Sequence, residues 1–108
     1  MNSLEVLKKT ILDLHGCDSE RVLSVPVHET YQGKVVWDGD VEVFLLIDHP
    51  PAKRAYAWSK DEFGEMRHVV ILGIPPINSP VDAVRAAIIE EARQKIPRGK
   101  AAFETGVG

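Results

Sequence analysis

The chain has 108 residues, 44% hydrophobic and 27% charged, a composition typical of one globular domain and unlike that of a disordered segment. Its formal net charge of −3 gives no overall attraction to a polyanion, which argues against nucleic-acid binding. The sequence shows no apolar run of membrane-spanning length, no signal peptide and a single cysteine, so it predicts a cytoplasmic protein without an intrachain disulfide.

The first expected element is an amphipathic N-terminal helix. Ser3 can cap its start, and Gly16 is a typical left-handed stop at its end. Apolar residues recur at spacings of three and four, which predicts one buried stripe. The stripe consists of Leu4, Leu7, Ile11 and Leu14.

An antiparallel meander of four or five strands is expected next. Pro26 cannot donate to a strand ladder, so the first strand should lie at a sheet edge or carry a bulge. Gln32-Gly33 indicates one turn, Asp38-Gly39 gives a strong hairpin signal, and Phe63-Gly64 indicates a third turn. The expected strands are residues 22–29, 34–37, 41–47, 53–60 and 66–72.

The strand at residues 41–47 is apolar on both faces. Val41 and Val43 point to one side, and Phe44 and Leu46 point to the other. If both helices cover one face, the other face would expose more apolar surface than most monomers leave in water. This pattern predicts a homodimer joined through sheet surfaces.

A second helix is expected over residues 79–96. Ser79 can cap it, Pro80 suits its first position, and Pro97 ends it. Its expected inward stripe is Val84, Ile88, Ala92 and Ile96. The elements together predict a single α+β domain at residues 1–97, with both helices packed on the sheet and a flexible tail at residues 98–108.

Tyr56 and Trp58 alternate with Arg54 and Lys60 along one strand face, an arrangement that can stack single-stranded nucleic acid if the rings are exposed. The alternative interpretation, which the net charge favours, buries both rings in the core or in a subunit interface. Small Ala55 and Ala57 on the opposite face suggest that a helix approaches closely there.

Asp48-His49, with Tyr56 across the hairpin, could supply acid–base groups to a small enzyme. The sequence Asp48-His49-Pro50-Pro51 is also typical of a turn, because Asp bonds to local backbone and the prolines fix the bend. The turn is the preferred interpretation. The four histidines lack metal-ligand spacing, and Cys17 follows a helix end, where a thiolate is not stabilised.

We therefore predict a binding module with an apolar, aromatic-lined pocket for a small molecule, either within the chain or at a dimer seam. The candidate ligand-binding residues are Trp37, Phe44, His49, Tyr56 and Trp58. No residue is assigned a catalytic or metal-binding role, and no cofactor is expected.

The sequence carries a set of four motifs: W-D-G-D-V-x-V-F at 37–44, H-P at 49–50, A-Y-A-W at 55–58 and I-P-P-x-x-S-P-x-x-A-V-R-A-A-I at 74–88. Over residues 31–90 it resembles small uncharacterised bacterial proteins of the integron-cassette and mobile-element type. This resemblance implies a bacterial source and no particular activity.

Overall fold

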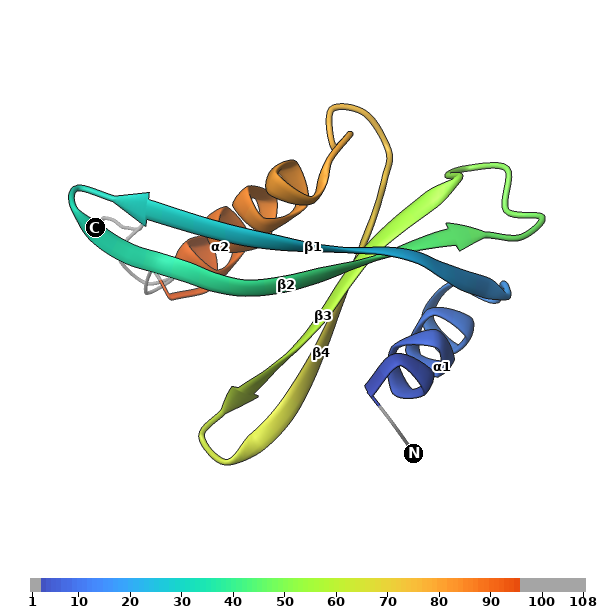
Figure 1. Ribbon diagram of the computed structural model, residues 1–108, viewed down its shortest axis with the longest axis horizontal. Coiled ribbons are helices and arrows are strands. Elements are labelled where there is room, and N and C mark those ends of the chain that lie inside the picture. Colours follow the sequence, from blue (N-terminus) through green and yellow to red (C-terminus); the bar gives the residue numbers. More distant parts are fainter. Residues whose placement is uncertain (1–2, 96–108) are drawn as a thin grey trace, which may run out of the picture.

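The computed structural model describes residues 3–95, which form one antiparallel sheet and two helices (Figure 1). The sheet order is β1-β2-β3-β4, so each strand pairs with its neighbour in the chain. The bounds are α1 Ser3–His15, β1 Ser19–Tyr31, β2 Lys34–Leu46, β3 Arg54–Glu62, β4 Glu65–Leu72 and α2 Pro80–Lys95. The expected α+β meander with two helices on the sheet is confirmed. The expected tail at 98–108, Pro97 and Ile96 lie outside the described residues.

The turn expected at Asp38-Gly39 is wrong, because β2 runs straight through it and pairs with β1 from Ser19 to Tyr31. The hairpin turns instead at Gln32-Gly33, where both residues have positive φ angles of 51° and 77°. Gly39 serves packing: a Cβ there would lie 3.3 Å from the Trp37 ring. The glycine leaves room for this ring, so two expected strands merge into one.

The prediction for Pro26 is confirmed in both of its forms. β1 is an edge strand, and its register with β2 shifts between Arg21 and Leu23 and again between Glu29 and Thr30. Edge position and bulges are where a strand tolerates a residue without an N–H group.

The two helices cover opposite faces of the sheet. The α1 cluster joins Leu7 and Ile11 of the helix to one face of β2 and β3, and the α2 cluster joins Ala83 and Val84 to the other face. Phe44 and Leu46, 1% and 7% exposed, are covered by α1. The premise that both helices share one face is therefore wrong, and the exposed Phe44 face does not exist. The buried sheet and loop residues of the α1 cluster are Cys17, Phe44, Leu46, Ala52, Ala55 and Ala57, and the buried strand residues of the α2 cluster are Val27, Val41, Val43, Tyr56 and Trp58.

Each helix departs from its expected stripe near its C-terminal end. Leu14 is 61% exposed, and buried Cys17 joins the α1 cluster from just beyond the helix. Ala92 is also exposed, whereas Ala83 and Val84 are fully buried. The expected cap is confirmed, because the Asp82 N–H donates to Ser79 Oγ at 3.1 Å.

Candidate binding site

The sheet opens between its two hairpins. β2 and β3 pair over four residues each, 42–45 with 54–57, although β2 extends back to Lys34 and β3 continues to Glu62. Beyond this short contact the hairpins separate toward their turns (Figure 1). The opening arises because each hairpin is long and fully paired internally, while few residues join one hairpin to the other.

Two tryptophans lie at the point where the hairpins separate. Trp37 of β2 and Trp58 of β3 meet edge to face, with ring centroids 5.4 Å apart and an interplanar angle of 77°. Trp58 is 3% exposed and Trp37 is half-buried. This geometry is favourable for two aromatic rings, and it bridges strands that no longer share a ladder at these positions.

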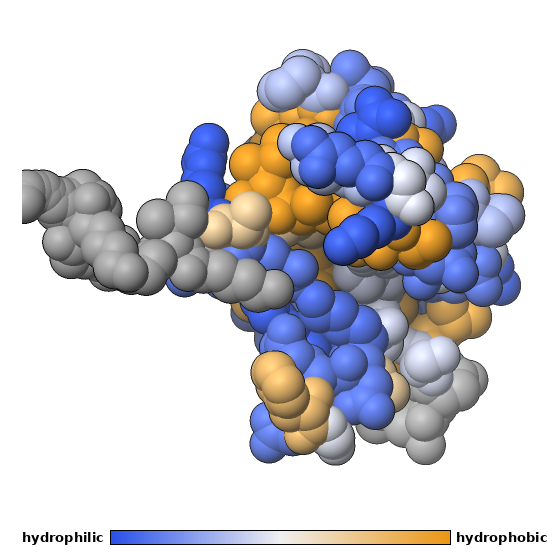
Figure 2. All heavy atoms as spheres, turned by 90° about the vertical axis from the view of Figure 1, so that its left-hand side faces the viewer, coloured by the Kyte–Doolittle hydropathy of each residue, from blue (hydrophilic) through white to orange (hydrophobic). Residues whose placement is uncertain are grey.

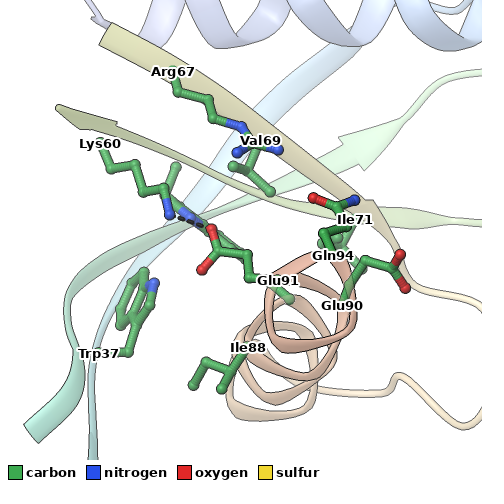
Figure 3. Close-up of a pocket in the computed structure, with 11 residues that line it drawn as sticks. Trp37, Lys60, Arg67, Val69, Ile71, Ile88, Glu90, Glu91 and Gln94 are labelled. Atoms are coloured by element: carbon green, nitrogen blue, oxygen red, sulfur yellow. Dashed lines mark hydrogen bonds and ion pairs between the residues drawn. The ribbon is translucent and has the colours of Figure 1, made fainter. Parts of the chain in front are cut away.

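A cavity of about 140 Å³ lies between this tryptophan pair, β4 and the C-terminal half of α2 (Figure 3). Its apolar wall combines the indoles with aliphatic side chains of β4 and α2, and its mouth carries charged and amide groups. The apolar residues are Trp37, Trp58, Val69, Ile71, Ala87 and Ile88, and the polar ones are Lys60, Arg67, Glu90, Glu91 and Gln94.

Ion pairs link the groups at the cavity mouth. Lys60 Nζ forms a close ion pair with the Glu91 carboxylate of α2, as Figure 3 shows, and lies 3.9 Å from Glu62 Oε2. Arg67 donates to Glu62 Oε1 at 3.3 Å. Both cations are therefore already partnered, and the Lys60–Glu91 pair connects the β3–β4 hairpin to α2.

A second hollow of about 260 Å³ adjoins the first and shares Trp37, Trp58, Lys60 and Glu91 with it. This hollow adds Asp38 and Asp40 from β2. Carboxylates consequently outnumber cations around the two hollows, and the local field favours a positively charged group beside the indoles.

The structure brings together part of the predicted ligand-binding set. Trp37 and Trp58 share the cavity, and Tyr56 belongs to the same α2 cluster but lines a different hollow, beside Arg54 and Gly73. Phe44 packs in the α1 cluster on the opposite face. His49 lies in the loop after β2, so the five residues do not form one pocket.

His49 faces the end of α1, where its ring centroid lies 6.1 Å from that of His15. Its Nε2 is buried without a hydrogen-bond partner in the described part of the chain. Burial lowers the pKa of His15, and the neighbouring His49 lowers it further. His49 and Tyr56 line different hollows, and the Ala52 N–H to His49 C=O bond of 3.2 Å confirms the expected turn.

Tyr56 and Trp58 are 2% and 3% exposed, which confirms the interpretation that both rings are buried. α1 packs against Ala55 and Ala57, both fully buried, as the small side chains predict. Neither ring has an open face on which a base could stack. Cys17 is a free thiol and is 7% exposed, more deeply buried than the half-buried thiol that its place after the helix predicts.

Lys60, Arg67 and Glu91 line the cavity but are not among the predicted ligand-binding residues. Counting back from the Phe63-Gly64 turn places Arg67 opposite Lys60, on the same strand face as Trp58, so the two cations were within reach of sequence reasoning. Glu91 was not, because it meets Lys60 through the docking of α2, which no local pattern specifies.

A separate apolar groove of about 430 Å³ runs between the end of the β1–β2 hairpin and the outer side of α2. Figure 2 shows hydrophobic side chains gathered over this part of the molecule, whereas the β3–β4 end is mostly hydrophilic. An ion pair between Arg85 Nε and Glu29 Oε1, 2.6 Å long, lies at the groove and raises the pKa of Arg85. The groove is lined by Glu29, Thr30, Tyr31, Val36, Arg85, Ile88, Ile89 and Ala92.

Comparison with known proteins places the chain in no class: no family model, curated protein or solved structure matches it significantly. Residues 3–95 contain no cluster of three or more histidine, cysteine or acidic side chains arranged to hold a metal ion. Neither described helix is long and apolar enough to cross a membrane.

Proposed function

We propose that this chain is a small cytoplasmic binding module whose ligand occupies the cavity beside Trp37 and Trp58. The observation that carries the proposal is the edge-to-face indole pair lining a cavity where the sheet opens. A pocket with an apolar wall and a few convergent polar groups is the usual form of a small-molecule site.

Cavity size and charge indicate the ligand class. An empty apolar cavity of roughly 150 Å³ accommodates one benzene ring, and the cavity here has about 140 Å³. The excess of carboxylates around the two hollows favours a protonated amine over an acid, and an ammonium group is also attracted to an indole face. The ligand is therefore a small organic amine with a compact apolar or aromatic body.

Binding is favoured over the two other functions that the sequence allows. An acid–base role for His49 and Tyr56 would need the two groups in one pocket, and they line different hollows. A nucleic-acid platform of Arg54, Tyr56 and Trp58 would need exposed rings and a basic surface. Both rings are buried, and the chain is acidic.

The test compares three probes that share one phenyl ring: benzylamine, benzyl alcohol and benzoate. We expect millimolar benzylamine to raise the melting temperature by several degrees and to change the tryptophan fluorescence, because a ligand that binds the folded state stabilises it. Benzyl alcohol should bind more weakly and benzoate least. Failure of all three probes to shift either signal contradicts the proposal, and a preference for benzoate contradicts the assigned charge.

A pair of alanine variants locates the binding. Ala87→Leu extends a side chain into the cavity and should abolish the benzylamine response without unfolding the protein. Ala92→Leu makes the same chemical change on the same helix but outside this cavity, and should keep the response. Equal responses from both variants would place the ligand elsewhere.

The proposal includes a homodimer, supported by the outer edge of β4, a strand that pairs only with β3 in the described sheet and in which Met66 is 60% exposed. Light scattering at micromolar concentration should report twice the chain mass. The resemblance to bacterial mobile-element proteins remains a prediction.

A further inference from the structure

The two outer edges of the sheet differ in how they are protected. β1 carries Pro26 and two register shifts, devices by which natural sheets block pairing with another chain. β4 has neither: its eight residues pair with β3 without a shift and include no proline or glycine. The β4 edge is thus the one that remains regular enough to accept another strand.

The hydrogen-bonding groups that β4 turns outward follow from its register. The Phe63-Gly64 turn makes Glu62 and Glu65 a bonded pair, and at the other end the Gly73 N–H donates to the Arg54 C=O at 2.8 Å. Odd-numbered residues of β4 therefore bond to β3, and even-numbered residues point their N–H and C=O groups away from it. The outward set is Met66, His68, Val70 and Leu72, of which the Leu72 C=O already accepts from the Ile74 N–H at 2.9 Å.

The side chains of β4 fit a second copy of the same strand. Glu65 and Arg67 lie in its first half, and residues 69–72 are aliphatic and half-buried between the helices. Antiparallel self-pairing places the charged half of each copy beside the aliphatic half of the other, so no like charges meet. A parallel arrangement would place each charge beside itself.

We propose that the homodimer forms by antiparallel pairing of β4 with β4 of a second copy, about a two-fold axis through Val69. This register follows because the outward residues are symmetric about Val69, so Met66 faces Leu72 and His68 faces Val70 across the axis. The product is a continuous eight-stranded sheet. The inference rests on the proposed homodimer and names the surface that joins it. Because Arg67, Val69 and Ile71 of β4 also line the ligand cavity, the tests measure mass and cross-linking, which do not require a bound ligand.

The first test removes one outward hydrogen-bond donor. Met66 is 60% exposed and its N–H is not used by β3, so Met66→Pro should leave the hairpin folded and halve the mass measured by light scattering. Met66→Ala keeps the N–H and should remain dimeric. A folded, dimeric Met66→Pro protein would contradict β4 pairing.

Cysteine cross-linking tests the register and does not depend on the proline variant. In a Cys17→Ser background, Val69→Cys places two thiols at a non-hydrogen-bonded pair with Cα atoms about 4.5 Å apart, which suits a disulfide. Oxidation should give a covalent dimer. Ile71→Cys on the same face is the control, because its two copies would be about 13 Å apart, four strand residues, and cannot be bridged.

The outcomes separate this inference from the homodimer itself. A monomeric wild-type protein contradicts both. A dimeric wild type whose Val69→Cys variant stays unlinked and whose Met66→Pro variant stays dimeric contradicts β4 pairing alone and places the interface elsewhere.

Discussion

The two faces of β3 show two ways of packing a helix on one sheet. On the α1 face, Ala55 and Ala57 bring the strand backbone close to Leu7 and Ile11, and the contact is closed. On the α2 face, the strand carries the large rings of Tyr56 and Trp58, and the backbone of α2 comes close to β3 at fewer positions than that of α1 does. The looser contact leaves the cavity that the indoles line.

This difference explains why the cavity lies on the α2 face of β3 and not on the α1 face. Small residues allow close helix–sheet contact, which fills space and leaves nothing for a ligand. Large flat rings pack less completely against a straight helix and leave space beside it, particularly where the two hairpins separate. The α1 face of β3 is therefore closely packed, and the α2 face carries the cavity in which we propose that a ligand binds.

The largest predicted effect is at Trp58, which is buried in the α2 cluster and also lines the cavity. Trp58→Ala should lower the free energy of unfolding by about 3–5 kcal/mol, because a nearly fully buried indole and its contact with Trp37 are lost. Denaturant unfolding monitored by circular dichroism measures the change.

Trp58→Phe is the matched control for this prediction. It retains a ring in the α2 cluster and should cost clearly less than the alanine variant. Two results together would contradict the burial of Trp58: an unchanged melting temperature for Trp58→Ala, and strong iodide quenching of Trp58 in a Trp37→Phe background. The indole would then be exposed in solution, and the α2 face of β3 would not be packed as described.

The sequence predicted the faces of β3 better than the turns of β2. Alternation is a local property, so the spacing placed Tyr56 and Trp58 on one face and Ala55 and Ala57 on the other, and the acidic net charge favoured burial of the two rings. The turn predicted at Asp38-Gly39 was wrong because this dipeptide usually marks a hairpin turn through its own backbone preference. Here Gly39 lies inside β2 and leaves room for the ring of Trp37.

The cavity could not be predicted because it depends on non-local geometry. Its shape requires the separation of two hairpins and the docking of α2, with Lys60 meeting Glu91 across 31 residues. Local patterns gave Ser79 as a cap and Pro26 as an edge residue, since each has a local physical cause. Which face each helix covers has no such local cause.

A second prediction tests the closed face. Ala57→Leu inserts a larger side chain where α1 meets the sheet, and should destabilise the protein by about 1–3 kcal/mol through overpacking. The exposed Ala92→Leu change adds the same atoms on α2 and should stay within about 0.5 kcal/mol of wild type. Equal melting temperatures for the two variants would show that α1 does not press closely on β3.

A third prediction concerns how α2 is held. Ser79→Ala removes the hydroxyl that accepts the Asp82 N–H and should cost about 1 kcal/mol. Ser79→Asp restores an acceptor and should recover most of this loss. Because the helix start lies away from the indoles, the tryptophan emission of the folded Ser79→Ala protein should be unchanged. A shifted emission would mean that the α2 face rearranges as a unit.

The smallest predicted effect is a pH dependence at the other helix. The pKa of His15 lies below its usual value of 6.5, first because of burial and then because of His49. Between the folded and unfolded pKa values the unfolded chain binds more protons, so stability should fall as the pH is lowered through about 6.5 and level off below the folded pKa. Thermal melts between pH 5 and 8, a range set by the ordinary titration of histidine, measure this slope.

His15→Gln should flatten the slope, whereas His49→Gln should only reduce it, because burial of His15 is the larger cause. If the stability of the His15→Gln variant still depends on pH as it does in the wild type, another group causes the pH dependence, and burial of His15 at the α1 face does not.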